Sequence, residues 1–471
     1  MNTTNQIVNW FNYAVLAYFG VANLVYLFLL VVACVVVVRH MRRLKYGRYQ
    51  EEMHSSLALP VTMIIAAYNE EKNIADTIKA LLRLNYPDFE VIVVDDGSTD
   101  GTLARLQEVF ELERADFVYR PIIQTSEVRA FYINPAIPKL TVVAKEHGGK
   151  ADSLNAGVNI SRSPYICSVD ADSILEEKAI TRLMRTVIED PDTIMATGGI
   201  VKILNGCLVR GGRIEELRLP KDSLSRFQIV EYIRSFLFGR AGWSAVNALL
   251  IISGTFSVIN KRALAAVGGY TKRTVTEDMD LILSLHKHFI EEKKRYKILF
   301  VPDPVCWTEA PQTFKMLARQ RRRWHMGLMQ SVLYHKKMLF NPKYSAVGLF
   351  AMPYQFIVEL FGPVVEIAGY VVVTLCFFLG IVDGKFFVLF LTLAILIGVL
   401  LSTGAILLEE MTYMRYPRKK DFLTLLLYGV LENFGYRQIN SLWRTQAVIM
   451  RLFGGKRWER VEKHGYKWKK G

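Results

Sequence analysis

A short apolar segment that ends in two aspartates constrains the fold of this chain more than any other feature. Residues Tyr165–Val169 are largely apolar and partly β-branched, and Asp170-Ala171-Asp172 follows them directly. This pattern predicts a buried strand of a parallel sheet, and open α/β sheets bind ligands beyond the carboxyl ends of their strands. Asp170 and Asp172 therefore form a candidate site for Mg²⁺ or Mn²⁺ bridging a diphosphate. Taken alone, the same residues are equally consistent with solvated aspartates in a turn.

Composition and charge narrow the class of protein. Of the 471 residues, 51% are hydrophobic, with long apolar runs near both ends, and a chain of this length can hold two or three domains. The net charge of +15 favours an anionic membrane surface or an anionic substrate. Nucleic acid is the weakest candidate partner, because the basic residues border the apolar runs and we find no reader motif. The five cysteines form no Cys-x-x-Cys pair, which fits a reducing compartment and indicates neither a disulfide framework nor a zinc site.

The first long apolar run predicts a membrane anchor. Residues 11–38 are almost wholly apolar and are long enough to cross a bilayer. The run has neither a basic leader nor a small-residue cleavage site, so we interpret it as an anchor and not as a removed signal peptide. Basic residues follow from Arg39 to Arg48. The positive-inside rule therefore predicts that this end faces the cytoplasm and that the N-terminus lies outside.

Residues 60–310 alternate between apolar runs and helical patterns, which predicts a doubly wound, mostly parallel α/β sheet. Asn69 is a plausible N-cap of a helix that reaches about Leu84. The stretch Ala115–Lys139 contains three prolines, and we interpret it as an irregular insertion at the sheet edge. Strands are predicted at Val61–Ala67, at Val91–Val94, at Leu140–Val143 and directly before Asp170 and Ser253.

Two acidic loops and one lysine are predicted to face a common cleft. Asp95 and Asp96 follow the second strand in the same way that Asp170 and Asp172 follow a later one, and the carboxyl ends of parallel strands open onto one crevice. Carboxylates there can accept hydrogen bonds from uracil N3 and from ribose hydroxyls. Lys150 follows two glycines and could reach a phosphate as a point charge. The glycine spacing is not that of a phosphate-cradling P-loop.

Six short motifs are spread over the chain from about Val61 to Trp324. They are Ala67-Tyr-Asn-Glu70, Val94-Asp-Asp-Gly-Ser-Thr-Asp100, Gly148-Gly-Lys150, Asp170-Ala-Asp172, Thr276-Glu-Asp278 and Gln320-Arg-Arg-Arg-Trp324. In these motifs the chain resembles the family 2 glycosyltransferases of the GT-A fold. More narrowly, it resembles the membrane-embedded processive synthases of cellulose, hyaluronan, chitin and poly-N-acetylglucosamine. Ala67 stands where relatives often carry a small polar residue.

The resemblance implies a role for each motif. Asp278 is the implied general base, since an acceptor hydroxyl must lose a proton as it attacks the anomeric carbon, and a direct inverting displacement needs no protein nucleophile. Taken alone, Thr276–Asp278 is more simply a helix cap. Asp170 and Asp172 are the implied metal ligands. The implied nucleotide-sugar-binding residues are Tyr68, Glu70, Asp96, Lys150, Asp170 and Arg323. The implied acceptor-binding residues are Ser253, Gly254, Thr255, Glu277, Gln320 and Trp324.

The segment that carries the Gln320–Trp324 motif also alternates basic and apolar residues from Lys315 to Lys337. That pattern predicts an amphipathic helix on the membrane surface. We expect the segment both to lie on the membrane surface and to serve as the Gln320–Trp324 motif. Trp324 can stack on a sugar face. His286 and His288 follow Asp278 on a predicted helix, and we expect them at the surface and not in a metal site.

Apolar runs return after Asn341. Ala346–Val382 exceeds one bilayer crossing, so it is tilted, kinked or divided in two. A tight turn at Asp383-Gly384-Lys385 precedes a second crossing at Phe386–Leu408. Leu423–Val448 mixes charges with aromatics and either lines a path for a sugar chain or lies at the interface with snorkelling arginines. Met414–Lys420 and the basic tail Lys456–Lys470 are expected in the cytoplasm, which favours three full crossings plus a re-entrant segment.

The sequence therefore predicts an α/β GT-A cytosolic domain joined to an α-helical transmembrane region. The predicted function is a multi-pass, inverting glycosyltransferase of the cytoplasmic (inner) membrane that polymerises and translocates a β-linked polysaccharide. The expected donor is UDP-N-acetylglucosamine or UDP-glucose, with Mg²⁺ or Mn²⁺. Expected partners are membrane lipids and accessory secretion proteins outside the membrane. The alternatives are a non-processive transferase with a lipid-phosphate acceptor and an inactive receptor or scaffold.

The expected domains are 1–50 (anchor and linker), 51–312 (GT-A), 313–342 (amphipathic helices), 343–455 (membrane helices) and 456–471 (basic tail).

Overall fold

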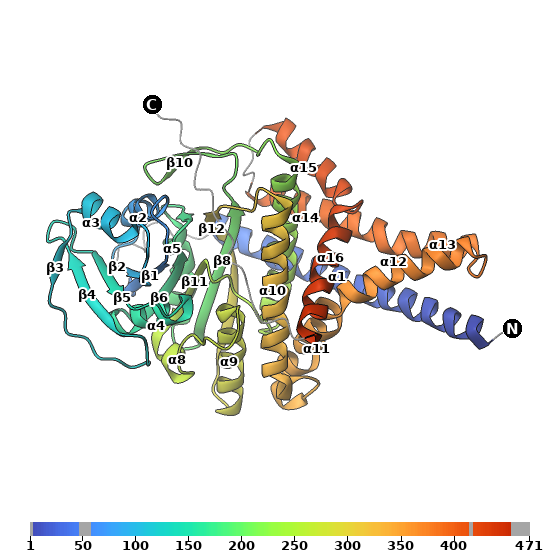
Figure 1. Ribbon diagram of the computed structural model, residues 1–471, viewed down its shortest axis with the longest axis horizontal. Helices are drawn as coiled ribbons and strands as arrows, with labels where there is room; N and C mark the ends of the chain where they lie inside the picture. Colours follow the sequence, from blue (N-terminus) through green and yellow to red (C-terminus); the bar gives the residue numbers. More distant parts are fainter. Residues whose placement is uncertain (1–2, 47–57, 414–417, 454–471) are drawn as a thin grey trace. The chain divides into compact units, whose positions relative to one another are not determined.

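The computed structural model describes residues 3–46, 58–413 and 418–453 (Figure 1). The described residues divide into two compact units. The sheet unit comprises residues 40–220 and 244–310, and the helical unit comprises the chain up to residue 39, residues 221–243 and the chain from residue 311. The sequence places residues 221–243 inside the 51–312 domain, whereas in the structure their helix α6 (Ser223–Arg234) packs against helices of the helical unit.

Within the described residues, ten strands of the sheet unit form one mixed sheet in the order β3-β4-β5-β2-β1-β6-β11-β8-β12-β7. Its central strands β5, β2, β1 and β6 run parallel, while β11 runs antiparallel to both of its neighbours. A separate antiparallel hairpin joins β9 to β10. The strands are β1 (Val61–Ala67), β2 (Phe89–Asp95), β3 (Glu113–Ala115), β4 (Val128–Ile133), β5 (Leu140–Lys145), β6 (Tyr165–Asp170), β7 (Ser173–Leu175), β8 (Ile194–Ile203), β9 (Leu208–Arg210), β10 (Arg213–Glu216), β11 (Phe256–Asn260) and β12 (Lys297–Thr308).

The register of the central strands fixes where their acids emerge. Ala67 at the end of β1 pairs with Asp95 of β2, and the neighbouring Ala66 pairs with Asp170 of β6. The two acids therefore lie on either side of β1 at the carboxyl edge of the sheet. The middle of each of the central strands β1, β2, β5 and β6 is buried because helices cover both faces of a doubly wound sheet. The helices of the sheet unit are α2 (Ile74–Leu82), α3 (Thr102–Phe110), α4 (Lys150–Ile160), α5 (Ala179–Glu189), α8 (Lys261–Ala266) and α9 (Glu277–Glu291).

Asn69 does not cap a helix, contrary to the sequence prediction. Helix α2 begins only at Ile74, and Asn69 takes a left-handed backbone conformation with φ 55°, which asparagine tolerates better than most residues. Its amide donates to Ser98 Oγ over 3.0 Å, and its Oδ1 accepts from the Thr99 amide over 2.8 Å. Asn69 therefore ties the loop after β1 to the loop after β2.

Two other predictions need correction. The apolar residues before Ser253 form no strand, and the strand of that region is β11, which begins at Phe256. The insertion Ala115–Lys139 does lie at the sheet edge, but it is not wholly irregular because it contributes β4. Pairing with β5 satisfies the backbone polar groups of β4, so tertiary context overrides a sequence rich in turn residues.

The helical unit contains the long apolar helices. Within the described part of the chain, two helical segments, Gln6–Arg43 and Gly384–Met411, are long and apolar enough to cross a membrane, with mean hydropathies of 2.9 and 2.7. The segments Val347–Leu360 and Gly362–Phe378 meet at an angle of 41° and make a third span if they count as one. The break lies directly before Pro363 in the first turn of α12, where proline lacks the N–H of a helix interior. This bend agrees with the kink expected within Ala346–Val382.

The helices of this unit are α1 (Thr3–Tyr46), α6, α7 (Ala241–Ala245), α10 (Phe314–Tyr334), α11 (Met352–Tyr354), α12 (Gly362–Phe378), α13 (Gly384–Leu391), α14 (Ile397–Tyr413), α15 (Lys419–Leu431) and α16 (Tyr436–Leu452). The last residues of α1 and α7 belong to the sheet unit. Helical segments with a π-type pattern extend α6 at Ser235–Arg240, precede α11 and α12 at Val347–Ala351 and Gln355–Leu360, and join α13 to α14 at Thr392–Leu396. Single 3₁₀ turns occupy Lys336–Met338 and Pro342–Tyr344. Residues 414–417 and the basic tail lie outside the described residues, so their expected location is not described.

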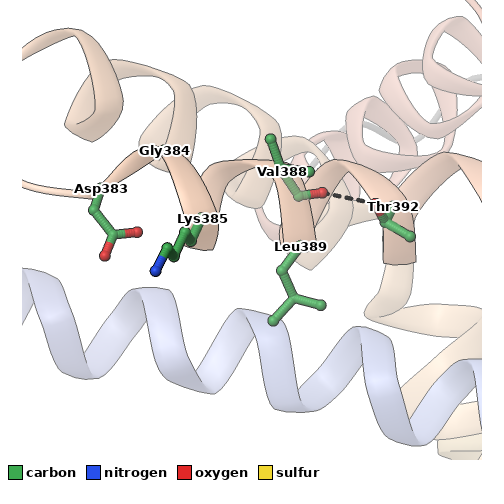
Figure 2. Close-up of a pocket in the computed structure, with 6 residues that line it drawn as sticks. All are labelled: Asp383, Gly384, Lys385, Val388, Leu389 and Thr392. Atoms are coloured by element: carbon green, nitrogen blue, oxygen red, sulfur yellow. Dashed lines mark hydrogen bonds between the residues drawn. The ribbon is translucent and has the colours of Figure 1, made fainter.

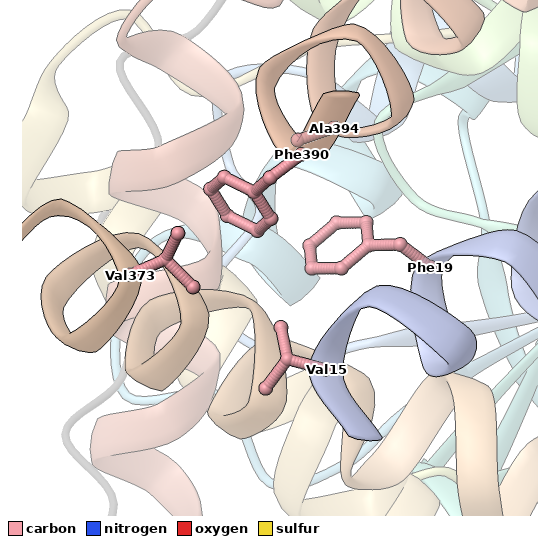
Figure 3. Packing of buried hydrophobic residues seen from close by; sticks show 5 residues of the cluster. All are labelled: Val15, Phe19, Val373, Phe390 and Ala394. Atoms are coloured by element: carbon pink, nitrogen blue, oxygen red, sulfur yellow. The ribbon is translucent and has the colours of Figure 1, made fainter. Parts of the chain in front are cut away.

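An apolar cluster holds α1 against the two helices that follow the bend (Figure 3). The Phe19 ring of α1 meets the Phe390 ring of α13 edge to face at 5.5 Å, a geometry that aromatic pairs favour. Val15, Val373 and Ala394 complete the buried cluster. The turn before α13 forms as predicted, with Asp383 accepting from the Phe386 amide over 2.7 Å. A shallow hollow lies on that turn and the start of α13, far along the chain from any predicted site residue (Figure 2).

Candidate active site

Residues from four separate segments of the sheet unit meet around Lys150, the first residue of α4. Its Nζ lies 2.7 Å from Asp170 Oδ1 and 3.1 Å from Glu277 Oε1. The other oxygen of Asp170 accepts from Thr255 Oγ1 over 2.8 Å. The end of β6, the loop before β11, the start of α4 and the start of α9 therefore converge. The sequence predicted that these residues act together, and the structure brings them into one hydrogen-bonded cluster.

The charges of this cluster stabilise one another. Burial by itself would lower the pKa of Lys150, but the carboxylates of Asp170 and Glu277 raise it well above its usual value. Lys150 is therefore a permanent cation whose side chain is 38% exposed. A partly exposed cation held in place by two carboxylates can meet an incoming anion such as a diphosphate at low reorganisation cost.

Asp278 lies in the first turn of α9, beside the Lys150 cluster. Its Oδ2 accepts from the Gly254 amide over 3.1 Å, and its Oδ1 accepts from the Met279 amide over 2.8 Å. Burial raises the pKa of Asp278, and the adjacent Glu277 raises it further, although Lys150 and the two amides act in the opposite direction. A raised pKa makes the carboxylate a stronger proton acceptor. The helix-start interpretation is also correct, since Thr276 is the N-cap of α9.

The loop Ser253–Thr255 contacts two acids of the site, Asp170 and Asp278. Gly254 donates to Asp278 and Thr255 donates to Asp170, while the Thr255 amide makes a long contact with Ser253 Oγ. A Cβ at Gly254 would lie 3.3 Å from Asp278 Cβ and Oδ2. A side chain here would need the Asp278 carboxylate to move by a few tenths of an ångström, so glycine favours this close approach of backbone to the carboxylate.

Asp96 is buried at the carboxyl end of β2, where it organises the loop that leads to Lys150. Its Oδ1 accepts from Lys145 Nζ over 2.7 Å and from the Gly148 amide over 2.9 Å, while its Oδ2 accepts from the Gly149 amide over 2.8 Å. Burial alone would raise the pKa of Asp96, but these donors lower it below its usual value. The observed role of Asp96 is to hold the glycine loop; its predicted contact with a nucleotide stays a prediction.

Sequence reasoning missed the buried cation of this region, Lys145. Its side chain is fully buried between Asp96 and Asp152, with Nζ 2.8 Å from Asp152 Oδ2. Lys272 makes a further ion pair with Asp152. A lysine at the last position of a strand looks like a solvated strand end, so the sequence carried no signal for a buried ion network.

We expect the substitution Lys145→Met to destabilise the sheet unit strongly. It would leave two carboxylates buried without their shared cation, and breaking a buried ion pair costs about 3–5 kcal/mol. The midpoint of thermal inactivation in detergent should fall by many degrees. The matched control Lys178→Met makes the same change at an exposed lysine before α5, and it should leave the midpoint nearly unchanged. A stable Lys145→Met protein would contradict the proposed role.

Tyr68 and Glu70 lie in the loop after β1. The Tyr68 ring lies 4.5 Å from the His147 ring, centroid to centroid, at 34°. The Glu70 amide donates to Thr102 Oγ1 over 2.9 Å. His147 also contacts Asp96, with Nδ1 2.9 Å from Oδ2. The residues predicted to bind the nucleotide, Tyr68 and Asp96, are thus joined through His147, which the sequence analysis did not single out.

The donor set at the end of β6 fits a divalent cation that is completed by substrate. Asp172 is 5% exposed, and Asp170 is partly exposed. Within residues 3–46, 58–413 and 418–453, no three His, Cys, Asp or Glu side chains are grouped to hold a metal by themselves. Two carboxylates suit Mg²⁺ or Mn²⁺, which keep water and phosphate ligands. Such an ion would neutralise charge on a departing diphosphate.

The remaining predicted residues, Gln320, Arg323 and Trp324, lie on α10 of the helical unit. Between them, Arg321 is buried and pairs with Glu231 Oε2 over 2.8 Å. The Arg321 guanidinium also lies 4.6 Å from the centroid of the Trp324 ring. The expected amphipathic helix is present, and one of its arginines faces inward and not towards solvent or lipid.

Charged residues of the last helices are paired inside the helical unit. Glu432 pairs with Arg234, while Arg444 Nη2 lies 2.9 Å from Glu359 Oε2. The sequence left open whether Leu423–Val448 lines a polar path or lies at the interface with snorkelling arginines. Internal ion pairs are typical of residues that line a polar path. An arginine at the interface would instead extend its charged end to the water at the membrane surface.

His286 is not at the surface, contrary to the sequence prediction. It is fully buried on α9, where its Nε2 lies 2.8 Å from the Leu249 carbonyl and its Nδ1 lies 2.7 Å from Tyr296 Oη. Two polar partners on other elements make its burial tolerable. His288 is half-buried and does not join the same network. Burial lowers the pKa of His286 to about 4, so it is neutral at physiological pH.

This burial predicts an acid-dependent loss of stability. The folded-state pKa of His286, about 4, lies below the ordinary histidine pKa of about 6.5. Between these two pH values the unfolded chain therefore binds a proton that the folded chain does not bind. Stability is therefore fully present above about pH 6.5 and falls as the pH is lowered towards 4, by about 2 kcal/mol at about pH 5. His286→Gln, which does not titrate, should lose less stability over the same range, as measured by thermal inactivation; equal losses would contradict the assignment.

The sheet order and the acids at the carboxyl ends of β2 and β6, with a third acid at the start of α9, define a GT-A type of nucleotide-sugar transferase. The chain belongs to the glycosyl transferase family group 2, which matches residues 165–401, about half of its length. Glycosyl transferase family 2 also matches residues 62–264. The family predicted from the motifs is thereby confirmed, and the protein is a glycosyltransferase.

Relatives and a solved structure agree with this assignment. The chain is 27% identical over 267 residues to the poly-β-1,6-N-acetyl-D-glucosamine synthase of Staphylococcus aureus, covering 57% of this chain and 54% of that protein. It is 26% identical over 268 residues to the same synthase of Staphylococcus epidermidis, with the same coverages. The chain thus spans about half the length of the curated relatives it matches. Its fold resembles a mannosyltransferase from Pyrobaculum calidifontis solved with GDP-Man and Mn²⁺, with a TM-score of 0.53 and 16% identity over 95% of this chain and 100% of that one.

Proposed function

We propose that this protein is a membrane-integrated, inverting glycosyltransferase that polymerises a β-linked polysaccharide from a UDP-sugar and passes the product through its own helices. UDP-N-acetylglucosamine is the favoured donor and UDP-glucose the next. The similarity to poly-β-1,6-N-acetyl-D-glucosamine synthases supports an N-acetylglucosamine donor. The catalytic unit would face the cytoplasm of a multi-pass protein in the cytoplasmic membrane.

The observation that carries the proposal is the position of Asp278 next to the Lys150 cluster. A half-buried carboxylate of raised pKa is suited to accept the proton of an acceptor hydroxyl. Lys150, held by Asp170 and Glu277, supplies a fixed positive charge for the departing diphosphate. One base and one region of positive charge suffice for a direct displacement with inversion, which needs no covalent intermediate.

The remaining predicted residues are proposed to have the roles that the family resemblance implies. Asp170 and Asp172 would hold Mg²⁺ or Mn²⁺ together with the diphosphate, and Tyr68, Glu70 and Asp96 would bind the nucleotide. Ser253, Gly254, Thr255 and Glu277 would meet the acceptor. Gln320 and Trp324 would bind the acceptor end, while Arg323 would contact the diphosphate.

Passage of the product is supported by the polar interior of the helical unit. Glu432 and Arg444 form ion pairs there, and the aromatic rings of Phe227 and Tyr436 stack at 4.8 Å. Aromatic and charged residues together can contact both the faces and the hydroxyls of sugars. Membrane lipids would surround the apolar helices Gln6–Arg43 and Gly384–Met411, and accessory proteins could receive the polymer outside.

The decisive experiment incubates membranes containing the protein with several UDP-sugars and Mg²⁺ or Mn²⁺, then sizes and digests the product. A long polymer from one donor, degraded by a linkage-specific hydrolase, is the expected result. A single sugar added to a lipid phosphate would instead indicate a non-processive transferase. Release of no UDP from any donor, even with Mn²⁺, would indicate an inactive receptor or scaffold.

A further inference from the structure

The segment Leu249–Gly254 carries the amide that binds Asp278, yet it has no secondary structure of its own. It lies between α7 and β11, so neither helix nor sheet hydrogen bonds hold it in place. Its position must come from side chains. One end is fixed where Gly254 donates to Asp278 Oδ2 over 3.1 Å, and the other end is fixed where the Leu249 carbonyl meets His286.

Both contacts of this segment lead to the same helix. Asp278 and His286 lie on α9, eight residues apart, and α9 continues without interruption from Glu277 to Glu291. At about 1.5 Å per residue, this separation is about 12 Å of rigid helix. The segment therefore runs alongside α9 and is bound to it at both ends.

Hydrogen-bond chemistry fixes the state of the imidazole. The Leu249 carbonyl can only accept, so His286 Nε2 carries the proton and donates to it. His286 Nδ1 then accepts from the hydroxyl of Tyr296. Neutral His286 satisfies both partners at once, so neither ring nitrogen is left unpaired in this fully buried site.

The start of the segment is reinforced by neighbouring contacts. The Asn247 side chain donates to the Tyr296 carbonyl over 3.0 Å and accepts from the Ile298 amide over 2.9 Å. In the middle of the segment, Ile252 lies directly on Gly198 of β8, where any side chain would overlap it. The segment is thus held against β8 and β12 as well as α9.

We infer that His286 is a positioning residue for the transfer reaction: by tethering the Leu249 carbonyl to α9, it holds the Gly254 amide against the Asp278 carboxylate. This inference rests on the proposed function, in which Asp278 is the general base. A shift of the Gly254 amide would change the orientation of that carboxylate towards the acceptor hydroxyl. It would leave the nucleotide-binding loops after β1 and β2 untouched.

The test compares variants of the full-length protein in detergent. His286→Gln keeps one donor and one acceptor, whereas His286→Leu removes both. His288→Leu is the matched control, because it makes the same change on the same helix outside the tether. We expect His286→Leu to lower kcat by about tenfold to a hundredfold with the KM for the donor nearly unchanged, and His286→Gln to stay within about threefold of the wild type.

Hydrogen–deuterium exchange gives a readout that does not depend on activity. In His286→Leu, the amides of residues 249–255 should exchange faster, while those of β1 exchange as in the wild type. Unchanged exchange in residues 249–255, an unchanged kcat, or a His286→Gln variant as impaired as His286→Leu would each overturn the inference. A second variant, Tyr296→Phe, serves if His286→Leu does not fold, because it removes only the hydroxyl that donates to Nδ1. It should produce the same changes in exchange and kcat, but smaller ones. Exchange and kcat equal to those of the wild type in that variant would likewise overturn the inference.

Failure of the proposed function would look different. A wild-type protein that transfers no sugar from any UDP-sugar would overturn the general-base role of Asp278, and with it the catalytic part of this inference. The exchange rates of residues 249–255 in the same variants would still decide whether His286 tethers the segment.

Discussion

The substitution Asp278→Asn is expected to abolish polymer formation while leaving UDP binding largely intact. Asparagine keeps the size of the side chain and can still accept from the Gly254 amide, but it cannot take a proton from an acceptor hydroxyl. Loss of a positioned general base lowers the rate by about 10²–10⁴-fold. The rate is measured as UDP release from the preferred donor, and UDP binding is measured by calorimetry in the same detergent.

Asp116→Asn is a matched control for this prediction, since it makes the same chemical change at an exposed aspartate beyond β3. That variant should polymerise at the wild-type rate. If Asp278→Asn loses UDP binding as severely as it loses turnover, Asp278 binds the nucleotide and another group must be the base. The local network makes this outcome informative, because Asp278 contacts the Gly254 and Met279 amides and lies near the charge of Lys150.

The sheet was predictable because the local sequence of each central strand has a recognisable pattern. The runs at Val61–Ala67 and Tyr165–Val169 are short and largely apolar, each begins directly after a proline, and the structure places β1 and β6 there. Buried parallel strands require such runs. The segment before β11 was misassigned because it is equally apolar. Leu249, Leu250 and Ile252 of this segment are buried without strand pairing, and Ile252 packs on Gly198 of β8.

The participants in the site were predictable, but their contacts were not. Asp170 and Asp278 stand out by motif, and topology brings strand ends to one edge. Nothing local to the sequence indicates that Lys150 joins Asp170 to Glu277, or that Gly254 donates to Asp278. Those contacts depend on residues that are more than a hundred positions apart in some cases, and their geometry is set by the packing of whole elements.

The sequence analysis did not predict the buried polar residues. Lys145 and His286 are both fully buried, yet each belongs to a residue type that is usually exposed or only partly buried. A polar side chain becomes tolerable inside a protein only when its partners are present, and those partners come from distant parts of the chain. The sequence therefore predicts acids at the ends of strands more readily than the buried groups that hold them in place.

Removal of divalent cations is expected to stop sugar transfer, and addition of Mn²⁺ or Mg²⁺ should restore it. A diphosphate leaving group develops negative charge, and a divalent cation between it and the carboxylates of Asp170 and Asp172 would neutralise that charge. Asp172→Asn should lower turnover by about 10²–10³-fold and should also raise the Mn²⁺ concentration needed for half-maximal UDP binding. The second measurement detects the ion without relying on catalysis.

Asp192→Asn, at an exposed aspartate before β8, controls for the loss of one negative charge and should leave the Mn²⁺ requirement unchanged. Full activity after exhaustive chelation would contradict a metal role for Asp170 and Asp172. In that case Lys150 would be the principal positive charge near the leaving group, and its ion pairs with Asp170 and Glu277 would explain why carboxylates gather at the end of β6. The metal titration of Asp172→Asn therefore decides whether the acids of this cluster bind a cation from solution or serve to position one supplied by the chain.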